Sequence, residues 1–334
     1  MELPRAIREA VDAALEGISL AELQGAAQRL SERYRAELRD GRKHLSDDLA
    51  ARAYLAARMP ATYAAIHATF DAIAEMRSDF QPATMLDVGA GPATGVFAAN
   101  DCWPEIAAAT LIENSGAIRS FGERLLAAGS IEKTQWLAHD LVTLPALTQR
   151  YDLVLLAYVL DELPPAAIPA LIKCLWDASG DMLVVVEPGT PAGWSRILSV
   201  RQELIVAGAH LVAPCPHALA CPLVEPDWCH FSRRVARSRM HRQVKSADVP
   251  WEDEKFVYIA ASRKPGVPVA ARVIAPPVLR GGTASLKLCE GDGHAAQRLL
   301  SRRDGAAFRQ ARRLAWGDAI GPDAIIPADS TASS

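Results

Sequence analysis

The chain has 334 residues, of which 50% are hydrophobic and 22% charged, and its formal net charge is -3. This length exceeds what one hydrophobic core normally organises, so about two or three cores are expected. No apolar run approaches the roughly 20 residues of a membrane-spanning helix, and the charged N-terminus is unlike a secretory signal. We therefore predict a cytoplasmic protein that does not span a membrane, in which clustered cysteines serve as ligands or catalysts rather than as disulfides.

Residues 1–80 have the pattern of a helical N-terminal domain. Apolar residues recur at helical spacing from Ile7 onwards. Ser19, followed three residues later by Glu22, fits a capping box at the start of a helix. This segment carries no evident chemistry, so its apolar stripes are expected to be packing surface.

Residues 81–265 predict an α/β domain. Short apolar runs alternate with helix-length segments; the runs are 84–88, 109–113, 134–138, 151–157, 181–187 and 255–262. Strands at this spacing indicate a mostly parallel sheet covered by helices on both faces. A binding crevice is then expected at the carboxyl ends of the strands.

A stretch that starts as a helix and then becomes irregular precedes the last of these runs, and we assign residues 209–250 to a cysteine-rich insertion. Beyond it, residues 266–325 alternate short runs with glycine turns, which predicts a small β-rich module. Residues 326–334 have the composition of a disordered tail.

A glycine-rich loop, "LDVGAGPATG" at 86–95, follows the first predicted strand and opens a helix. Gly89 and Gly91 allow the backbone to turn tightly and approach a ligand, and the helix start presents free N–H groups. A dinucleotide-binding loop has the spacing G-x-G-x-x-G, whereas the third glycine of this loop, Gly95, comes one residue later. An acidic residue, Asp87, precedes the loop. The spacing therefore favours a nucleotide cofactor other than a dinucleotide.

This stretch resembles the first motif of class I S-adenosylmethionine-dependent methyltransferases, with Ala93 where the last glycine of that pattern usually falls. The resemblance implies a Rossmann-like class I fold that binds S-adenosyl-L-methionine through Asp87, Gly89 and Gly91. It also implies that Glu113 accepts the ribose hydroxyls.

The same resemblance gives roles to three residues after the third and fourth strands. Asp140 matches the position that flanks the adenine, and Tyr158 and Asp161 follow the fourth strand, near where the methyl group would lie. Tyr158 is thus a candidate cofactor contact, and both residues are candidate catalytic groups. Enzymes of this fold that methylate exocyclic base nitrogens usually carry Asn or Asp before Pro-Pro-aromatic here, whereas this chain reads "YVLDELPP", so the reaction stays open.

Cys215, Cys221 and Cys229 lie in one proline-interrupted stretch, with five and then seven residues between them. Zinc sites usually show shorter Cys-x-x-Cys spacings, so this irregular set favours an iron-sulfur cluster, with zinc as the less favoured alternative. A nucleophilic role for Cys215 is disfavoured because it follows the fifth strand rather than the fourth. Further ligand candidates are Cys102, Cys174, Cys289, His217, His230 and His294, of which Cys289 has the most polar, glycine-flanked setting.

Arginines gather in two runs. The candidate RNA contacts are Arg233, Arg234, Arg237, Arg239 and Arg242 in the first, and Arg302, Arg303, Arg312 and Arg313 in the second. Such runs on a near-neutral chain indicate a localised anionic partner such as a phosphate backbone, the alternative being a solvated helix face.

The pieces Pro-Cys-Pro-His, Cys-Pro and Trp-Cys-His-Phe-Ser, in this order, resemble the small-ribosomal-subunit methyltransferase-like family over roughly residues 40–315. The resemblance implies a [4Fe-4S] cluster held by Cys215, Cys221, Cys229 and Cys289, and binding to small-subunit rRNA in the assembling ribosome. Three functions are compatible with these patterns: an rRNA methyltransferase, an assembly factor that binds without catalysing, and a small-molecule methyltransferase with structural zinc. A monomer is expected.

Overall fold

Four helices precede the first strand in the computed structural model, which describes residues 1–35, 45, 47–129 and 131–324. They are α1 (Arg5–Leu15), α2 (Leu20–Arg35), α3 (Asp48–Ala57) and α4 (Met59–Met76). The capping box is confirmed at the start of α2, where the Ser19 backbone N–H donates to Glu22 Oε2 at 3.3 Å and the Glu22 backbone N–H donates to Ser19 Oγ at 3.3 Å. The predicted tail at 326–334 lies outside the described residues.

The central sheet confirms the predicted α/β class. Its strands are β1 (Thr84–Val88), β2 (Ala108–Ile112), β3 (Lys133–Leu137), β4 (Tyr151–Ala157), β5 (Ser179–Pro188), β6 (His210–Ala213), β7 (Phe231–Ala236) and β8 (Trp251–Ser262). The order β3-β2-β1-β4-β5-β8-β6 starts with five parallel strands, and β8 then runs antiparallel between β5 and β6. Each of the six predicted runs overlaps one of these strands.

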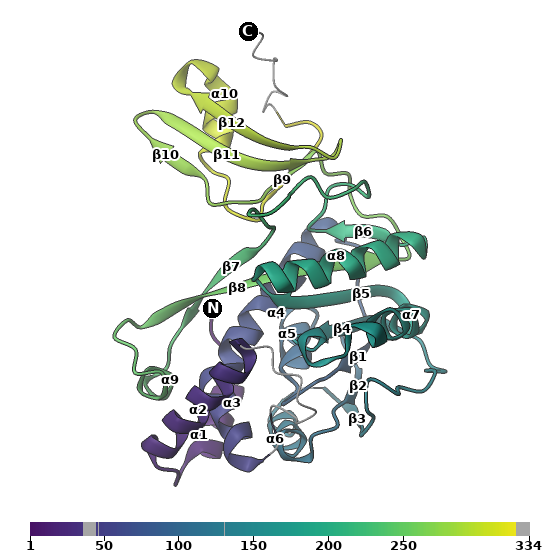
Figure 1. The fold of residues 1–334 in the computed structure, drawn as a ribbon, viewed down its shortest axis with the longest axis vertical. Helices are drawn as coiled ribbons and strands as arrows, with labels where there is room; N and C mark the ends of the chain where they lie inside the picture. The colour runs from purple at the N-terminus through teal and green to yellow at the C-terminus, as the bar shows by residue number, and fades with distance from the viewer. Residues whose placement is uncertain (36–44, 46, 130, 325–334) are drawn as a thin grey trace.

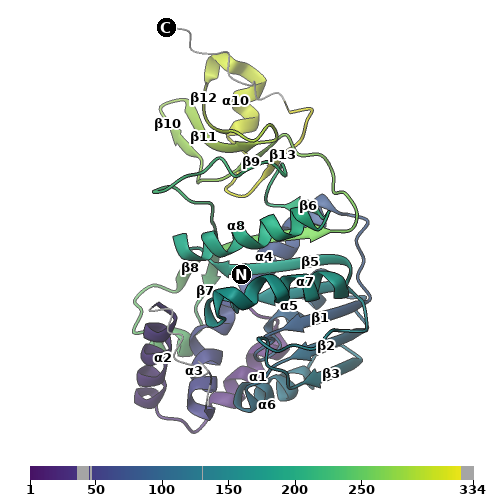
Figure 2. The same cartoon turned by 45° about the vertical axis from the view of Figure 1, so that its right-hand side comes forward.

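Helices cover both faces of this sheet (Figures 1 and 2). They are α5 (Thr94–Cys102), α6 (Gly116–Leu126), α7 (Ile168–Ala178) and α8 (Pro191–Val206), with the short α9 (Arg239–Val244) beyond β7. Successive strand residues point to opposite faces, so Met85 packs with the N-terminal helices, α5 and α6, whereas Leu86 packs with α7 and α8. The N-terminal helices therefore share one core with the sheet.

The C-terminal part forms a second, smaller sheet above the first (Figure 1). Its elements are β9 (Ala271–Val273), β10 (Val278–Arg280), β11 (Thr283–Glu290), β12 (Ala295–Ser301), α10 (Gly305–Ala311) and β13 (Ala319–Ile320). Strand β11 is central, because it pairs with β9, β10 and β12. Alternate β11 residues, including Leu286 and Leu288, fill a separate core against Phe308 of α10.

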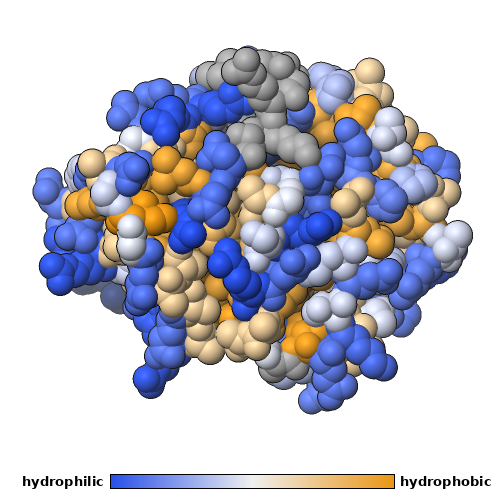
Figure 3. Space-filling view, turned by 90° about the horizontal axis from the view of Figure 1, so that it is seen from below, coloured by the Kyte–Doolittle hydropathy of each residue, from blue (hydrophilic) through white to orange (hydrophobic). Residues whose placement is uncertain are grey.

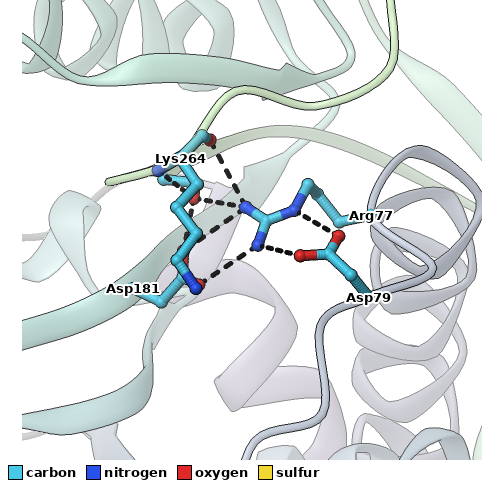
Figure 4. Close-up of polar contacts among 5 residues, drawn as sticks. Arg77, Asp79, Asp181 and Lys264 are labelled. Atoms are coloured by element: carbon cyan, nitrogen blue, oxygen red, sulfur yellow. Dashed lines mark hydrogen bonds and ion pairs between the residues drawn. The ribbon is translucent and has the colours of Figure 1, made fainter.

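Arg77 joins the end of α4 to strands β5 and β8 of the central sheet (Figure 4). Its guanidinium is 3% exposed and donates two bonds to Asp79, at 2.8 and 2.9 Å. It also pairs with Asp181 of β5 at 3.2 Å and donates to Ser262 of β8 at 2.7 Å. Because removing one partner would leave a buried charge uncompensated, this group fixes α4 against β5 and β8.

The end of the molecule opposite the C-terminal sheet is a mixed surface, on which hydrophobic patches are separated by polar and charged side chains (Figure 3). None of the helices in the described part of the chain has the length and hydropathy of a membrane-spanning segment.

Candidate functional site

A cavity of about 1600 Å³ opens at the carboxyl ends of the parallel strands and is closed on one side by residues of α2 and α3. Its wall includes most of the cofactor and catalytic candidates, namely Gly89, Gly91, Glu113, Asp140, Tyr158 and Asp161. Parallel strands end at the same edge of a sheet, which is why residues so far apart in the chain meet there.

The loop after β1 uses glycine for two different reasons. Gly89 and Gly91 have φ of 69° and 53°, the left-handed region that favours glycine. At Gly89 a side chain would also meet Val159, since an added Cβ would lie 2.4 Å from Cγ2 of that residue. Ala93, where the family pattern has glycine, also has a left-handed φ of 67° at the start of α5.

Replacing Gly95 by alanine is expected to lower the free energy of unfolding by about 1–3 kcal/mol, the usual cost of overpacking. An added Cβ would lie 2.3 Å from Leu155 Cδ2 and 2.7 Å from Asp87 Oδ2, between α5 and the sheet. Denaturant unfolding measures the change. Gly116→Ala at the start of α6 is the control, because nothing lies within 4 Å of its added Cβ; equal losses in both variants would contradict the steric reason.

Asp87 lies behind the loop rather than in the cavity wall. It is 3% exposed, and burial, followed by the nearby Glu113 carboxylate, raises its pKa to about 7. The structure therefore separates Asp87 from the other cofactor candidates: it supports the loop and α5 and does not line the cavity.

Glu113 follows β2 and receives two backbone N–H groups. Its Oε2 accepts from Gly91 at 3.0 Å and its Oε1 accepts from Ser115 at 2.7 Å. These two bonds orient the Glu113 carboxylate at the wall of the cavity. Asp140 is exposed at the rim and accepts from the Val142 N–H at 2.8 Å.

Tyr158 belongs to a group that the sequence analysis missed. Its hydroxyl donates to Glu254 Oε1 at 3.1 Å, and the same oxygen is 3.3 Å from Nη2 of Arg58. Burial, and then the Glu254 charge, raise the pKa of Tyr158 well above its usual value. Arg58 comes from the junction of α3 and α4, and Glu254 from β8, so no local motif connects them with Tyr158.

The floor of the cavity beside Tyr158 is acidic. Asp161 is buried, and Glu162 next to it has a pKa raised to about 8 by burial and then by Asp161. Glu187 at the end of β5 is fully buried, pairs with Arg196 at 2.7 Å, and has a pKa raised to about 7 by burial and then by Asp161. Carboxyl groups gathered in this way oppose one another's ionisation.

Cys215, Cys221, Cys229 and Cys289 converge between the two sheets. Burial raises the pKa of Cys229 well above its usual value, and the thiols of Cys215, Cys221 and Cys289 raise it further. The pKa of Cys289 rises to about 12 for the same reasons, burial first and then Cys215 and Cys221. The four predicted ligands thus come together, although Cys289 lies on β11 and the others precede β7.

Two buried arginines hold the cysteine loop by its backbone. Arg201 of α8 donates to the carbonyls of His217 and Leu219 at 2.8 and 2.6 Å, and Arg272 of β9 donates to Pro214 O at 2.9 Å. Both are under 5% exposed, and within the described residues neither pairs with a carboxylate. Burial raises the pKa of the Cys215 thiol, whereas these two guanidinium groups act to lower it.

Polar atoms around the cysteines remain without protein partners. Arg201 Nε, Arg272 Nη2 and His217 Nδ1 are buried and form no hydrogen bond within the described part of the chain. His217 Nε2 is 3.4 Å from the sulfur of Cys289. Buried donors of this kind usually have an acceptor, so their arrangement fits an anionic group among the cysteines.

Aromatic contacts connect the cysteine loop with both neighbouring parts of the molecule. The indole N–H of Trp228 donates to Gly189 O at 3.1 Å, and Gly189 lines the cavity. The Trp228 ring stacks on His230, which meets Trp316 of the C-terminal part edge to face at a centroid distance of 5.0 Å.

The first arginine run is not an unopposed basic surface, because its arginines on and after β7 lie beside carboxylates. Strand β8 places Asp253 directly opposite Arg234, and the two pair at 2.9 Å. Arg237 pairs with Glu252 at 2.9 Å and is only 13% exposed, and Arg233 lies 3.5 Å from Asp71. Glu252 and Asp253 follow the arginines in the chain and meet them through the pairing of β7 with β8, whereas Asp71 comes from α4.

The other predicted RNA contacts are exposed. Arg239 and Arg242 lie on α9, and Arg302, Arg303, Arg312 and Arg313 lie around α10. Within the described ranges these six arginines form no ion pair with a carboxylate, so the second run offers more free positive charge than the first.

The sheet order, the glycine loop and the acidic residues at the strand ends define a class I methyltransferase fold. The family model described as "Mitochondrial small ribosomal subunit Rsm22" matches residues 48–321, so the chain belongs to the Rsm22 family. The human "Ribosome assembly protein METTL17, mitochondrial" is 31% identical over 80% of this chain and 61% of its own length. "Rsm22-cox11 tandem protein 2, mitochondrial" of Schizosaccharomyces pombe is 24% identical over 84% of this chain and 44% of its own length. The chain thus spans about half to three-fifths of these curated relatives.

Solved structures with a similar fold include methyltransferases. An O-methyltransferase family protein from Burkholderia thailandensis is 12% identical, with 74% of this chain and 71% of that chain covered and a TM-score of 0.45. Magnesium protoporphyrin IX methyltransferase from Synechocystis, with bound SAM, is 14% identical, with 70% and 91% covered and a TM-score of 0.38.

The expected cytoplasmic location is wrong by comparison with the family. The family description and the curated relatives all name the mitochondrion. The sequence argument relied on the absence of a secretory signal, which does not distinguish the cytoplasm from an organelle.

Proposed function

We propose that the chain is an S-adenosylmethionine-binding, iron-sulfur-containing methyltransferase-like protein that acts on small-subunit rRNA during ribosome assembly. The observation that carries this proposal is the Rsm22-family match across residues 48–321, which includes the cysteine group and the strand-end residues of the cavity. The relatives are named as ribosome assembly or Rsm22 proteins.

The cavity supports the choice of cofactor. Its loop and carboxylates are those that would receive an adenosine, with Gly89 and Gly91 near the chain of the cofactor and Glu113 at the ribose. S-adenosylmethionine would supply an electrophilic methyl group on a positively charged sulfur. The acidic floor formed by Asp161 and Glu162 suits such a cation, because a nearby positive charge favours ionised carboxylates.

The cysteine group supports an anionic metal centre. Four thiolates around a [4Fe-4S] core carry net negative charge, and the buried guanidinium groups of Arg201 and Arg272 would offset it. Zinc would draw its thiolates together at about 2.3 Å from one ion. The spacing of Cys215, Cys221 and Cys229 lacks the short Cys-x-x-Cys pairs usual for such a zinc site and favours a cluster.

A map of small-subunit rRNA modifications with and without the gene tests the methyltransferase role. One modification lost together with the gene would support methyl transfer. An unchanged map alongside an assembly defect would eliminate it, and would leave a factor that binds rRNA without catalysing.

This second candidate is favoured by the contacts of Tyr158. A catalytic base must reach the acceptor, yet the Glu254 carboxylate beside Tyr158 is paired with Arg58 at 3.3 Å and receives the Tyr158 hydroxyl. The Asn- or Asp-Pro-Pro-aromatic signature is also absent after β4. In this alternative the ligands of the cavity and of the cysteine group stabilise a fold that binds rRNA and catalyses no methyl transfer.

Glu113→Ala is expected to weaken S-adenosylmethionine binding about 10- to 100-fold, because a hydrogen bond to a charged group contributes about 1.5–3 kcal/mol. Isothermal titration with S-adenosylmethionine measures the affinity. Glu105→Ala, an exposed glutamate outside the cavity, is the matched control. Unchanged affinity in a folded Glu113→Ala protein would contradict the assigned ribose contact.

A further inference from the structure

A second cluster of candidate metal ligands lies where α4 meets the end of α5. His67 and Asp71 are four residues apart on α4 and therefore on one helix face, and Cys102 is the last residue of α5. One ligand atom from each lies within 4.8 Å of the other two. The cluster shares no residue with the cavity or the four-cysteine group.

The imidazole of His67 is oriented by a neighbouring carboxylate. Its Nε2 lies 3.2 Å from Asp101 Oδ2, and the Tyr63 hydroxyl donates to the same oxygen at 2.7 Å. A carboxylate on one ring nitrogen fixes the proton there and leaves the lone pair on the other, as is usual for metal-bound histidines. Asp101 therefore prepares Nδ1 of His67 as a ligand atom.

The atoms that face Nδ1 are acceptors. Nδ1 is buried and lies 3.2 Å from Asp71 Oδ2. A ring nitrogen of His67, a carboxylate oxygen of Asp71 and the sulfur of Cys102 all lie within 4.8 Å of one another. A divalent cation would bind the nitrogen, the oxygen and the sulfur together. A second proton on the imidazole would join only the nitrogen and the carboxylate oxygen.

We propose that His67, Asp71 and Cys102 bind a divalent cation of the zinc class, with Asp101 holding the histidine from behind. Imidazole nitrogen, carboxylate oxygen and thiolate sulfur are the usual zinc ligands, and three protein ligands leave a position for water. Asp71 is 47% exposed, which gives the ion a path from solvent.

Arg233 of β7 pairs with Asp71 and would compete with a cation for this carboxylate. Its Nη2 lies 3.5 Å from Asp71 Oδ2, and both side chains are close to half exposed. Exposed ion pairs of this kind are weak, so a cation held by three ligands would displace the guanidinium. The exposed Arg233 would then be released towards solvent, next to the other arginines of β7.

Co²⁺ titration of the full chain, purified without oxygen, tests the site. Bound thiolate gives Co²⁺ a charge-transfer absorption, and wild type is expected to show one equivalent more than Cys102→Ser. Because the four-cysteine group contributes equally to both proteins, the difference spectrum reports only this site. Cys174→Ser is the matched control, as another partly buried cysteine outside both groups. Equal Co²⁺ stoichiometry in wild type and Cys102→Ser would overturn the proposal.

Two more variants keep the test decisive if Cys102→Ser folds poorly. Asp71→Asn changes a half-exposed side chain, so the protein is expected to stay folded and lose the extra equivalent. Asp101→Asn is expected to weaken binding about 10- to 100-fold while keeping the thiolate absorption, as for other carboxylates behind a ligand histidine. A folded Asp71→Asn protein that binds Co²⁺ as wild type does would overturn the proposal, because Asp71 would then not be a ligand.

Discussion

Replacing Cys229 by serine is expected to remove the iron and the colour from the protein. Purified without oxygen, the wild-type chain should be brown and absorb near the blue end of the visible spectrum. Cys229 interacts with the three other thiols, and serine supplies no thiolate at the centre of the group. Iron analysis and the visible spectrum measure the loss.

The control for this experiment is Cys174→Ser, which changes a cysteine of α7 that lies outside the group. It is expected to retain wild-type iron and colour. Zinc without iron in the wild-type protein would eliminate the cluster and favour a structural zinc site. Iron that persists in Cys229→Ser would remove this residue from the ligand set.

Arg272→Met is expected to lower the free energy of unfolding by about 3 kcal/mol. The guanidinium is 1% exposed and donates to Pro214 O at 2.9 Å and to Gly317 O at 3.0 Å. Methionine fills similar space but leaves the buried Pro214 carbonyl and the partly buried Gly317 carbonyl without this donor, and an unsatisfied buried acceptor costs about 1–3 kcal/mol. Denaturant unfolding of the protein measures the change, and iron content is expected to fall with it.

An exposed arginine of the same C-terminal part provides the comparison. Arg303→Met changes a side chain at the surface, so stability should stay within about 0.5 kcal/mol of wild type. If both variants lost stability equally, the carbonyl contacts of Arg272 would not be the cause.

The central sheet could be predicted well from the sequence, because its strands are short apolar runs separated by helix-length segments. The run at 151–157 became β4 with the predicted limits, and buried strands of parallel sheets characteristically have such continuous apolar stretches. The loop at 86–95 and the carboxylate of Glu113 could be assigned for a related reason, since their positions at strand ends fix where they meet.

Contacts between distant elements could not be predicted in this way. Arg58, Tyr158 and Glu254 come from three separate parts of the chain, and only the packing of α3, α4 and β8 joins them. The pairing of Arg234 with Asp253 depends on the register of β7 against β8. A shift of one residue would turn the arginine to the opposite face of the sheet and separate the pair. A charge count along the chain therefore overestimated the free positive charge of β7.

The position of β8 determines when this protein can fold during synthesis. Strand β8 ends at Ser262, yet it lies between β5 and β6 and pairs with both. The apolar face of α4 is covered partly by this late strand, which contributes Tyr258 and Ala260 to the same core. Helix α4 must therefore leave the ribosome with part of its core missing, and the complete sheet can form only after most of the chain has been translated.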